Sequence, residues 1–477
     1  MSFTPGWLRT NHAKAPEPPP GGGEPRPRVV IIYASAGAGH DHASQELARR
    51  LRARGLRADC VDLADILPWG LGRLLRGTYH GMLSRVPWLY GLLFAIGSTF
   101  GPAAPITRVL LRPAQSRVLR ALPPDTRAVV STYPVVSQLV GPLRSAGRLA
   151  VPAVTYLTDF AVNPLWVSPG IDVYCAAHPT TRAEARALGA GEVWVAGRMV
   201  SDAFRPGARD ERRRIRERLG LPVDARIALL VAGSWGVGAV ARTAAEIAGT
   251  GVAVPVVICG RNTALYRRLR RRGVDHVFGW VDDMPELLRA ADVLVENAGG
   301  LTALEAMASG VPVATYRPIP GHGRANAATM SRAGVATWIR RRADLAPTLL
   351  RLAEGPLGGR QRAAGLALFR TDPAQVVAAV ARGVASSPTR RRPRVGASGR
   401  RTGADPAGDP APLGSGALPE PADRLVPPGA GAVVTTPRRP ATRWVGLRAG
   451  VLRLWPGPTQ PLGTGGTRPA DRPSRRG

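Results

Sequence analysis

Two segments of the sequence repeat one local pattern: a short apolar run, a glycine-rich turn and then a helical pattern. The first runs from Val29 to Leu51 through a turn at 35–40, and the second starts at Ile227 and passes a turn at 232–238. A buried strand that leads through glycines into a helix is how a Rossmann-like unit begins. Two such starts within 477 residues predict two domains.

Further short apolar runs follow each start and alternate with helical stretches. They lie at residues 129–132, 153–157, 173–176 and 193–196 in the first half, and at 254–258, 292–295 and 311–314 in the second. Apolar runs of this length, separated by helices, predict parallel strands that are buried on both faces. We therefore predict an α/β fold in which two doubly wound Rossmann-like domains face a cleft.

Composition sets the limits of the two domains. Residues 1–27 are rich in proline and glycine, and residues 387–477 are rich in arginine as well, so both are predicted to be disordered tails. The boundary near residues 203–212 divides the rest into an N-terminal domain, 28–205, and a C-terminal domain, 206–386. A helical stretch at 345–384 is predicted to close the second domain.

The formal net charge of +32 favours an anionic partner, either lipid headgroups or nucleic acid. The sequence contains no zinc-finger spacing and no RNA-recognition aromatic motif, so nucleic acid is the less favoured partner. No obligatory protein partner is evident. The isolated Cys60, Cys175 and Cys259 fit a reduced, cytoplasmic protein, and the polar N-terminus is unlike a signal peptide.

No charged residue occurs between Arg85 and Arg108, but prolines and glycines interrupt this run. An interfacial helix with residues 88–94 as its inserting face and a buried helix pair are both open, and a membrane span is less favoured. We expect a cytoplasmic protein that associates peripherally with the plasma membrane.

His40 stands where the first strand gives way to its helix. Ligands of open α/β sheets bind at this end of the strands, and a histidine there can accept a proton from an attacking hydroxyl near neutral pH. We interpret His40 as a catalytic base; the alternative is a histidine that only caps or packs the helix. A dinucleotide turn would have glycine where His42 stands, so an oxidoreductase with Asp59 or Asp62 as its ribose acid is less favoured.

The second glycine turn and the segment 279–305 predict a nucleotide site. Backbone amides of the turn can receive a diphosphate at a helix N-terminus without a metal. Thr302 and Glu305 are three residues apart on the helix that begins after a glycine pair, so they share one face, with a hydroxyl for the phosphates and a carboxylate for the ribose hydroxyls. Asp282 and Asp283 are predicted to cap the helix that follows them.

From Val29 to Gly334 the sequence resembles the monogalactosyldiacylglycerol synthase and diacylglycerol glucosyltransferase family and, more distantly, the lipid II-forming N-acetylglucosaminyltransferase. The segments that carry the resemblance are the glycine–histidine turn at 35–44, the diphosphate loop at 232–238, the strand end at 258–262, the uracil, phosphate and ribose region at 279–284 and 298–305, and a sugar-binding stretch with Pro320, Gly321 and Asn326.

The resemblance implies a GT-B glycosyltransferase that needs neither metal nor cofactor. It would transfer a hexose with inversion from a UDP-sugar to a lipid such as diacylglycerol at the cytoplasmic membrane face. It makes His40 the acceptor base and places Gly37, Gly39 and Asp159 on the acceptor side. The nucleotide-sugar residues that it implies are Gly233, Ser234, Gly236, Gly238, Arg261, Trp280, Met284, Gly299, Gly300, Thr302, Glu305, His322 and Asn326.

Four features depart from the family pattern. His322 and Gly323 replace Gln-Glu, Asn297 replaces a lysine, Trp235 a glutamate and Asn163 a histidine. The lost carboxylate would hold sugar hydroxyls, so the sequence does not predict which sugar is used. A UDP-sugar epimerase on the same fold and a weakened UDP-binding scaffold are the alternatives to a transferase.

Overall fold

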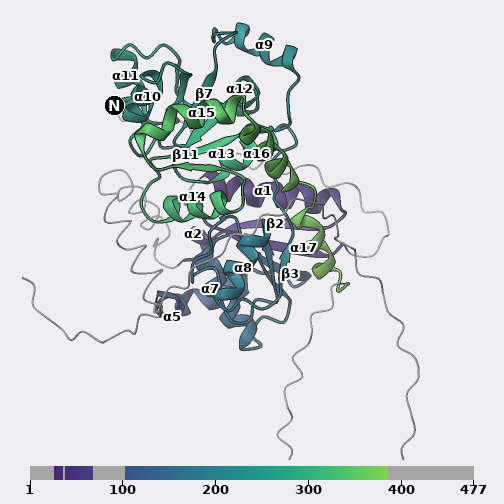
Figure 1. Ribbon diagram of the computed structural model, residues 1–477. Coiled ribbons are helices and arrows are strands. Elements are labelled where there is room, and N and C mark those ends of the chain that lie inside the picture. The colour runs from purple at the N-terminus through teal and green to yellow at the C-terminus, as the bar shows by residue number, and fades with distance from the viewer. Residues whose placement is uncertain (1–25, 36–37, 68–102, 385–477) are drawn as a thin grey trace, which may run out of the picture. The chain divides into compact units, whose positions relative to one another are not determined.

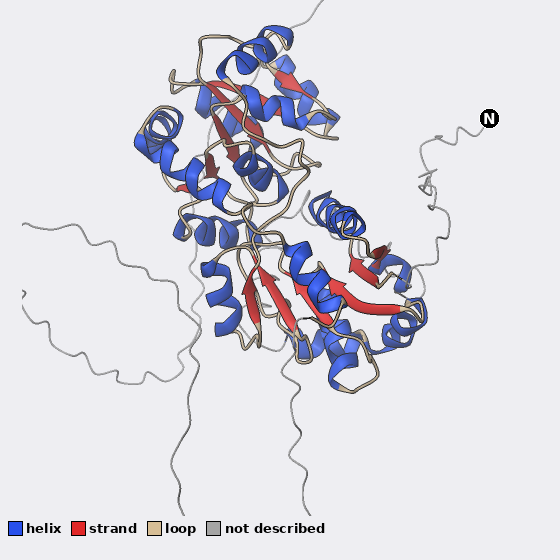
Figure 2. Cartoon of the chain, turned by 90° about the vertical axis from the view of Figure 1, so that its right-hand side faces the viewer, coloured by secondary structure: helices blue, strands red, loops and turns tan. Residues whose placement is uncertain are grey.

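Two six-stranded parallel sheets, each with helices on both faces, form the structure (Figures 1 and 2). The computed structural model describes residues 26–35, 38–67 and 103–384, which belong to one unit that ends at Pro393. The prediction of two doubly wound α/β halves is confirmed. The boundary between residues 205 and 206 stays a prediction, and the predicted tails lie outside the described residues except for residues 26 and 27.

The first sheet has the strand order β2-β1-β3-β4-β5-β6. Its strands are β1 (Arg28–Tyr33), β2 (Arg57–Asp62), β3 (Thr126–Ser131), β4 (Ala153–Tyr156), β5 (Val173–Ala176) and β6 (Val193–Val195). Its helices are α1 (Ala38–Ala53), α2 (Leu63–Ile66), α5 (Ala103–Leu110), α6 (Arg112–Ala121), α7 (Pro134–Ser145) and α8 (Pro179–Ala187). The strand order reverses between β1 and β3, and such a reversal opens a ligand crevice at the carboxyl ends of the strands.

The second sheet repeats this plan in the order β12-β11-β10-β7-β8-β9, with its reversal between β7 and β10. Its strands are β7 (Ile227–Val231), β8 (Val254–Ile258), β9 (Val277–Phe278), β10 (Val293–Glu296), β11 (Val313–Tyr316) and β12 (Thr337–Ile339). Its helices are α9 (Arg209–Arg218), α10 (Val240–Ala248), α11 (Thr263–Arg271), α12 (Met284–Ala290), α13 (Leu301–Ala308), α14 (His322–Arg332), the 3-10 turn η2 (Arg342–Asp344), α15 (Leu345–Ala353) and α16 (Pro356–Ala367).

Three strands, β2, β9 and β12, were not predicted. All three are edge strands, where side chains are half-exposed and the apolar pattern weakens. The two acids considered for a ribose in the first half lie on β2 and have structural partners instead. Asp59 pairs with Arg28, and Asp62 accepts a hydrogen bond of 2.9 Å from the backbone N–H of Ala64 at the start of α2.

The last helix, α17 (Pro373–Ala381), packs in the core of the first half, although the sequence placed it with the second. Its buried Val377 and Ala378 share a core with Leu47 and Leu51 of α1, and Figure 1 shows α17 beside the β-strands of the first half. Asp372 accepts a 2.9 Å hydrogen bond from the N–H of Ala374 and so caps the helix. The chain therefore crosses back after the second sheet is complete.

An ionic cluster in the second half surrounds the buried Glu246 of α10, which is 7% exposed. Its carboxylate accepts hydrogen bonds from the Tyr316 hydroxyl at 2.8 Å, from Arg317 at 2.7 and 2.9 Å and from Arg242 at 3.0 Å. Burial raises the pKa of Glu246, but these partners together outweigh burial and lower it to about 2. Arg317 has φ of 52°, a backbone conformation that is uncommon outside glycine.

We expect Glu246→Gln to lower the free energy of unfolding at pH 7 by about 3 kcal/mol, since a pKa held near 2 stabilises the fold above the ordinary carboxyl pKa. This contribution is lost as the pH falls from about 4.5 toward 2. Urea unfolding at pH 7 measures the loss. The control is Glu354→Gln, whose pair with Arg226 is exposed to solvent and is expected to contribute little to stability. Equal losses in the two variants would contradict the prediction.

None of the helices in the described segments is long and apolar enough to cross a membrane. The uncharged run that was considered as an interfacial segment lies outside the described residues as far as residue 102, and its remaining part begins α5.

Candidate active site

Loops that follow the carboxyl ends of the two sheets contact each other. A Cβ atom built on Gly39, in the first turn of α1, would lie 3.4 Å from the Cβ of Leu301 at the start of α13. The N–H of Ala161, after β4, donates a 2.9 Å hydrogen bond to the side chain of Asn326 on α14. The end of the first sheet where β1 and β3 meet therefore lies close to the end of the second sheet where β7 and β10 meet.

His40 lies at the reversal of the first sheet and is held by groups that follow β3 and β4. Its Nδ1 is 3.2 Å from the carbonyl oxygen of Thr132 and 3.1 Å from the hydroxyl of Thr158. The ring of Tyr133 meets the imidazole edge-on, with 5.0 Å between the ring centroids. Ser44, one turn further along α1, is 2.8 Å from the Thr132 hydroxyl and fixes that segment against the helix.

These contacts determine which nitrogen of His40 can accept a proton. A carbonyl oxygen only accepts hydrogen bonds, so Nδ1 beside Thr132 must carry the hydrogen. The Thr158 hydroxyl is 3.4 Å from the same carbonyl and can donate to it while accepting from Nδ1. Nε2 is therefore the unprotonated nitrogen of the neutral ring, as a general base requires.

His322 begins α14 and lies in the electrostatic field of both Asp159 and His40. Burial lowers the pKa of His322, the charge of Asp159 opposes this shift, and His40 adds to it. Asp159, after β4, accepts a 3.3 Å hydrogen bond from the indole of the buried Trp166. The structure thus brings the residue predicted for the sugar beside two residues predicted for the acceptor and its proton.

The second glycine turn is fixed at the reversal of the second sheet by Asn297, which follows β10. The amide of Asn297 donates a 2.8 Å hydrogen bond to the carbonyl of Val237. Gly238 has φ of 100°, and a Cβ atom there would lie 2.6 Å from the Asn297 amide nitrogen, so this position requires glycine. Gly233, Ser234 and Gly236 precede it in the same turn, between β7 and α10.

The turn between β10 and α13 is organised by Glu296, which is buried. Its carboxylate accepts hydrogen bonds from the N–H of Ala298 at 2.6 Å, from the N–H of Gly299 and from the Thr315 hydroxyl. Burial raises the pKa of Glu296, and its three hydrogen bonds oppose that rise. The carboxylate therefore shapes the turn that presents Gly300 and the N-terminus of α13, and the sequence had given it no role.

Thr302 and Glu305 lie in the first two turns of α13, as the sequence predicted. Glu305 is 9% exposed, and burial alone raises its pKa to about 7. No hydrogen bond or ion pair joins its carboxyl group to another side chain in the described part of the chain. A mostly buried carboxylate without donors is costly, and hydroxyl groups of a ligand would supply the missing donors.

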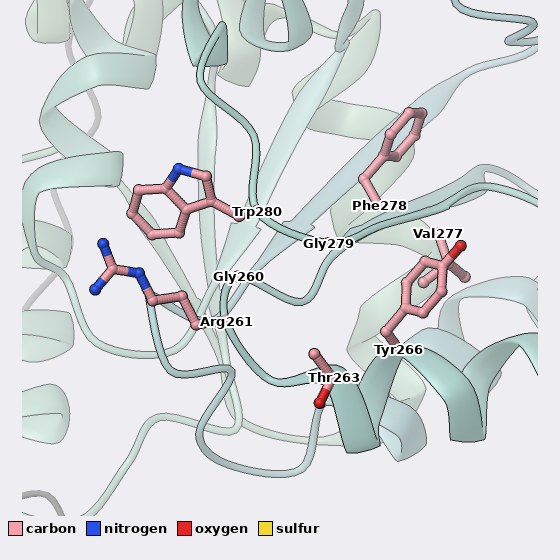
Figure 3. Close-up of a pocket in the computed structure, with 8 residues that line it drawn as sticks. All are labelled: Gly260, Arg261, Thr263, Tyr266, Val277, Phe278, Gly279 and Trp280. Atoms are coloured by element: carbon pink, nitrogen blue, oxygen red, sulfur yellow. The ribbon is translucent and has the colours of Figure 1, made fainter. Parts of the chain in front are cut away.

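A pocket of about 500 Å³ follows β8 and β9 (Figure 3). On one side of the pocket, the Arg261 guanidinium lies 4.4 Å from the centre of the Trp280 ring. Tyr266 lies on the opposite side of the pocket. The indole of Trp280 donates a 2.8 Å hydrogen bond to Asp282, so Asp282 does not cap the next helix as predicted. Asp283 does, since its carboxylate accepts a 3.1 Å hydrogen bond from the N–H of Glu286.

Three predicted site residues either lie outside the described segments or make structural contacts. Gly37 lies outside the described residues. Met284 packs its half-buried side chain against the core of the second half, and Asn326 is 1% exposed with its amide shared between Ala161 and the carbonyl of Ala298. The nucleotide role of Met284 and the sugar role of Asn326 stay predictions.

Sequence reasoning missed the residues that orient His40. Thr132 and Thr158 come from segments about a hundred residues away along the chain. The only signal in the sequence was that each threonine lies within two residues of the end of a buried strand. Within the described residues, no group of three His, Cys, Asp or Glu side chains is placed to hold a metal ion.

Two family models match the chain. Residues 40–194 match monogalactosyldiacylglycerol (MGDG) synthase, and residues 229–354 match glycosyl transferases group 1. The processive diacylglycerol beta-glucosyltransferase of Bacillus pumilus (strain SAFR-032) is 28% identical over 47% of this chain and 60% of that protein. The enzyme of the same description from Bacillus cereus (strain AH187) is 30% identical over 47% of this chain and 58% of that protein.

The chain thus spans about three fifths of the length of these relatives. Among solved structures, the MurG of Acinetobacter baumannii is similar at a TM-score of 0.46 and 17% identity, covering 75% of this chain and 100% of that chain. The family models and the relatives confirm the resemblance to the monogalactosyldiacylglycerol synthase and diacylglycerol glucosyltransferase family.

Proposed function

We propose that this chain is a glycosyltransferase that transfers a hexose, with inversion and without a metal ion, from a UDP-sugar to a lipid hydroxyl such as that of diacylglycerol. The observation that carries the proposal is that a possible base lies close to a possible nucleotide site. The base is His40, whose Nε2 is unprotonated. The nucleotide site is the N-terminus of α13, and the contact of Gly39 with Leu301 brings it close to His40. The similarity to diacylglycerol glucosyltransferases supports a lipid acceptor.

The second half would bind the donor. The uracil would occupy the pocket beside Trp280, and the ribose hydroxyls would donate hydrogen bonds to Glu305. The diphosphate would lie against the amides of the 232–238 turn and the N-terminus of α13, beside the Thr302 hydroxyl. Backbone amides at a helix N-terminus stabilise negative charge, which increases on the diphosphate as the bond to the sugar breaks.

The first half would bind the acceptor and remove its proton. Nε2 of His40 would take the proton of the lipid hydroxyl while that oxygen forms a bond to the anomeric carbon. The bond between this carbon and the diphosphate oxygen breaks, and UDP leaves with the electron pair. Attack from the side opposite UDP inverts the configuration, and no covalent enzyme intermediate forms. The interaction of His322 with Asp159 and His40 supports a role for His322 in binding the sugar and in sugar choice.

We also propose that the protein works at the cytoplasmic face of the plasma membrane as a peripheral protein. The net charge of +32 supports attraction to an anionic membrane surface, and a lipid acceptor requires access to one. Sedimentation with phosphatidylcholine vesicles, with and without anionic lipid, tests this. Binding that is no stronger with anionic lipid would refute the electrostatic part of the proposal.

The release of UDP tests the transferase proposal. We expect the full chain to release UDP from one or more members of a UDP-sugar panel at a rate that depends on added diacylglycerol vesicles. A transferase without acceptor can only hydrolyse its donor, so the rate without diacylglycerol should be low. Conversion of the free UDP-sugar to an isomer without lipid would indicate the epimerase instead, and UDP binding without any release would indicate a scaffold.

Nucleoside affinity should depend on pH through Glu305. Burial raises its pKa to about 7 in the unliganded protein, and only the ionised carboxylate accepts two hydrogen bonds from ribose hydroxyls without donating. We therefore expect the affinity for uridine to fall about tenfold from pH 8 to pH 6, since the ionised fraction falls by that factor. Calorimetry with uridine avoids titration of a ligand phosphate, and Glu305→Gln should bind weakly at both pH values.

A further inference from the structure

A second pocket, of about 490 Å³, lies at the far edge of the second sheet, beside β11 and β12. Its lining includes Arg317, Pro318, Arg324, Trp338, Arg340 and Arg342. We name it the arginine pocket. It shares no lining residue with the pocket beside Trp280, and the glycosyl transfer described above makes no use of it.

The arginine pocket carries an unbalanced positive charge. Arg317 is neutralised by Glu246, but Arg324, Arg340 and Arg342 form no ion pair or side-chain hydrogen bond with another described residue. No carboxylate lines the pocket. The neighbouring Arg341 does not line it and pairs with Asp344 at 3.0 Å, so acidic partners are available in this segment but lie outside the pocket.

Two of the arginines are held in place before any ligand binds. The guanidinium of Arg340 lies 4.0 Å from the centre of the Trp338 ring, and Arg317 is fixed by its two hydrogen bonds to Glu246. Cation–π contact and ion pairing reduce the entropy that an arginine loses on binding. The planar guanidinium donates paired hydrogen bonds, which match the oxygens of a phosphate.

We propose that the arginine pocket binds the phosphate group of an anionic ligand, separately from the UDP diphosphate. Three unpaired arginines favour a group with more than one negative charge, such as a phosphate monoester. Both aromatic rings of the lining, Tyr316 and Trp338, lie against arginines, Arg317 and Arg340. The groups that the pocket offers to a ligand are therefore guanidinium N–H donors, and these match the oxygens of a phosphate.

Such a ligand would contact the segment that leads to His322. Arg317, Pro318 and Arg324 flank this segment, and the N–H of Ile319 within it donates a 2.8 Å hydrogen bond to the carbonyl of Asn297. Asn297 in turn holds the glycine turn at Val237. A phosphate in the arginine pocket would therefore contact the segment that joins β11 to α14, the helix that begins at His322.

Binding of a phosphate monoester by the full chain tests the proposal in two arms. Calorimetry measures the binding of glycerol 3-phosphate, a soluble phosphate monoester. Sedimentation with phosphatidylcholine vesicles that contain phosphatidic acid measures the binding of the same phosphate group on a lipid. The test variant combines Arg340→Gln with Arg342→Gln. The matched control combines Arg267→Gln with Arg268→Gln, which removes the same charge from exposed positions on α11.

We expect the test variant to bind at least one of the two ligands about tenfold more weakly than the parent protein, since charge-assisted contacts are lost. The control variant should change by less than about twofold, as expected for surface charges far from a ligand. A loss in the soluble arm identifies a free phosphate ligand, and a loss with vesicles alone identifies a lipid headgroup. Equal losses in both variants, or no loss in either arm, would overturn the proposal.

Discussion

Replacing His40 with alanine is expected to lower turnover by about a thousandfold, which is within the range that general base catalysis contributes. UDP affinity should stay within about threefold of the parent value. The reason lies in the contacts of the side chain: Thr132, Thr158 and Tyr133 all belong to the first half, whereas the proposed nucleotide contacts belong to the second. Steady-state rates with UDP-sugar and diacylglycerol vesicles, together with UDP calorimetry, measure both quantities.

His42→Ala is the matched control, since His42 is exposed on the same helix and should leave turnover within about twofold. Thermal unfolding of both variants shows whether α1 is intact. If His40→Ala retained turnover at the control level, His40 would be a helix-start residue without a catalytic role. A fall in UDP affinity as large as the fall in turnover would also contradict its assignment as a base.

Replacing Glu305 with methionine is expected to have opposite effects on binding and on stability. UDP affinity should fall by more than about a hundredfold, because two hydrogen bonds from ribose hydroxyls to a charged carboxylate contribute about 3 kcal/mol or more. The free energy of unfolding at pH 8 should rise by about 1–3 kcal/mol. Burial raises the pKa of Glu305 to about 7, so at pH 8 the folded protein bears the cost of a buried carboxylate that methionine removes.

The sign of the stability effect follows from this raised pKa. An acid whose folded pKa exceeds its unfolded value makes the fold less stable as the pH rises from about 4.5 through 7. The gain from methionine should therefore shrink when unfolding is measured at pH 5. Glu354→Met, at an exposed position, should leave UDP affinity unchanged. A Glu305→Met protein that is less stable at pH 8 and still binds UDP would show that the carboxylate is structural.

Much of the fold could be predicted because its inner strands are apolar on both faces. Residues 173–176, 227–231 and 254–258 were predicted as strands and are strands with the same limits. The edge strand β2 has charged residues at Arg57, Asp59 and Asp62, which interrupt the apolar run, and so lacks this signal. The return of α17 to the first half could not be predicted either, since an apolar helix face does not indicate which of two cores it will join.

The candidate site was predictable where a motif is local. Thr302 and Glu305 fall on one helix, so their spacing was enough to place them together. The proximity of His322 to Asp159 arises from two loops that are more than 160 residues apart, and no pattern within either loop contains it. The same holds for Glu246 and Arg317, whose pairing joins α10 to the residue that follows β11, 71 residues further along the chain.

The most direct test of the account is mass spectrometry of lipids extracted after the full chain has acted on diacylglycerol vesicles with each UDP-sugar in turn. We predict a product heavier than diacylglycerol by one hexose residue with at least one donor. Its anomeric configuration, determined by NMR, should be inverted relative to the donor. No glycosylated lipid with any donor, or a product with retained configuration, would contradict a single displacement by a lipid hydroxyl that His40 deprotonates.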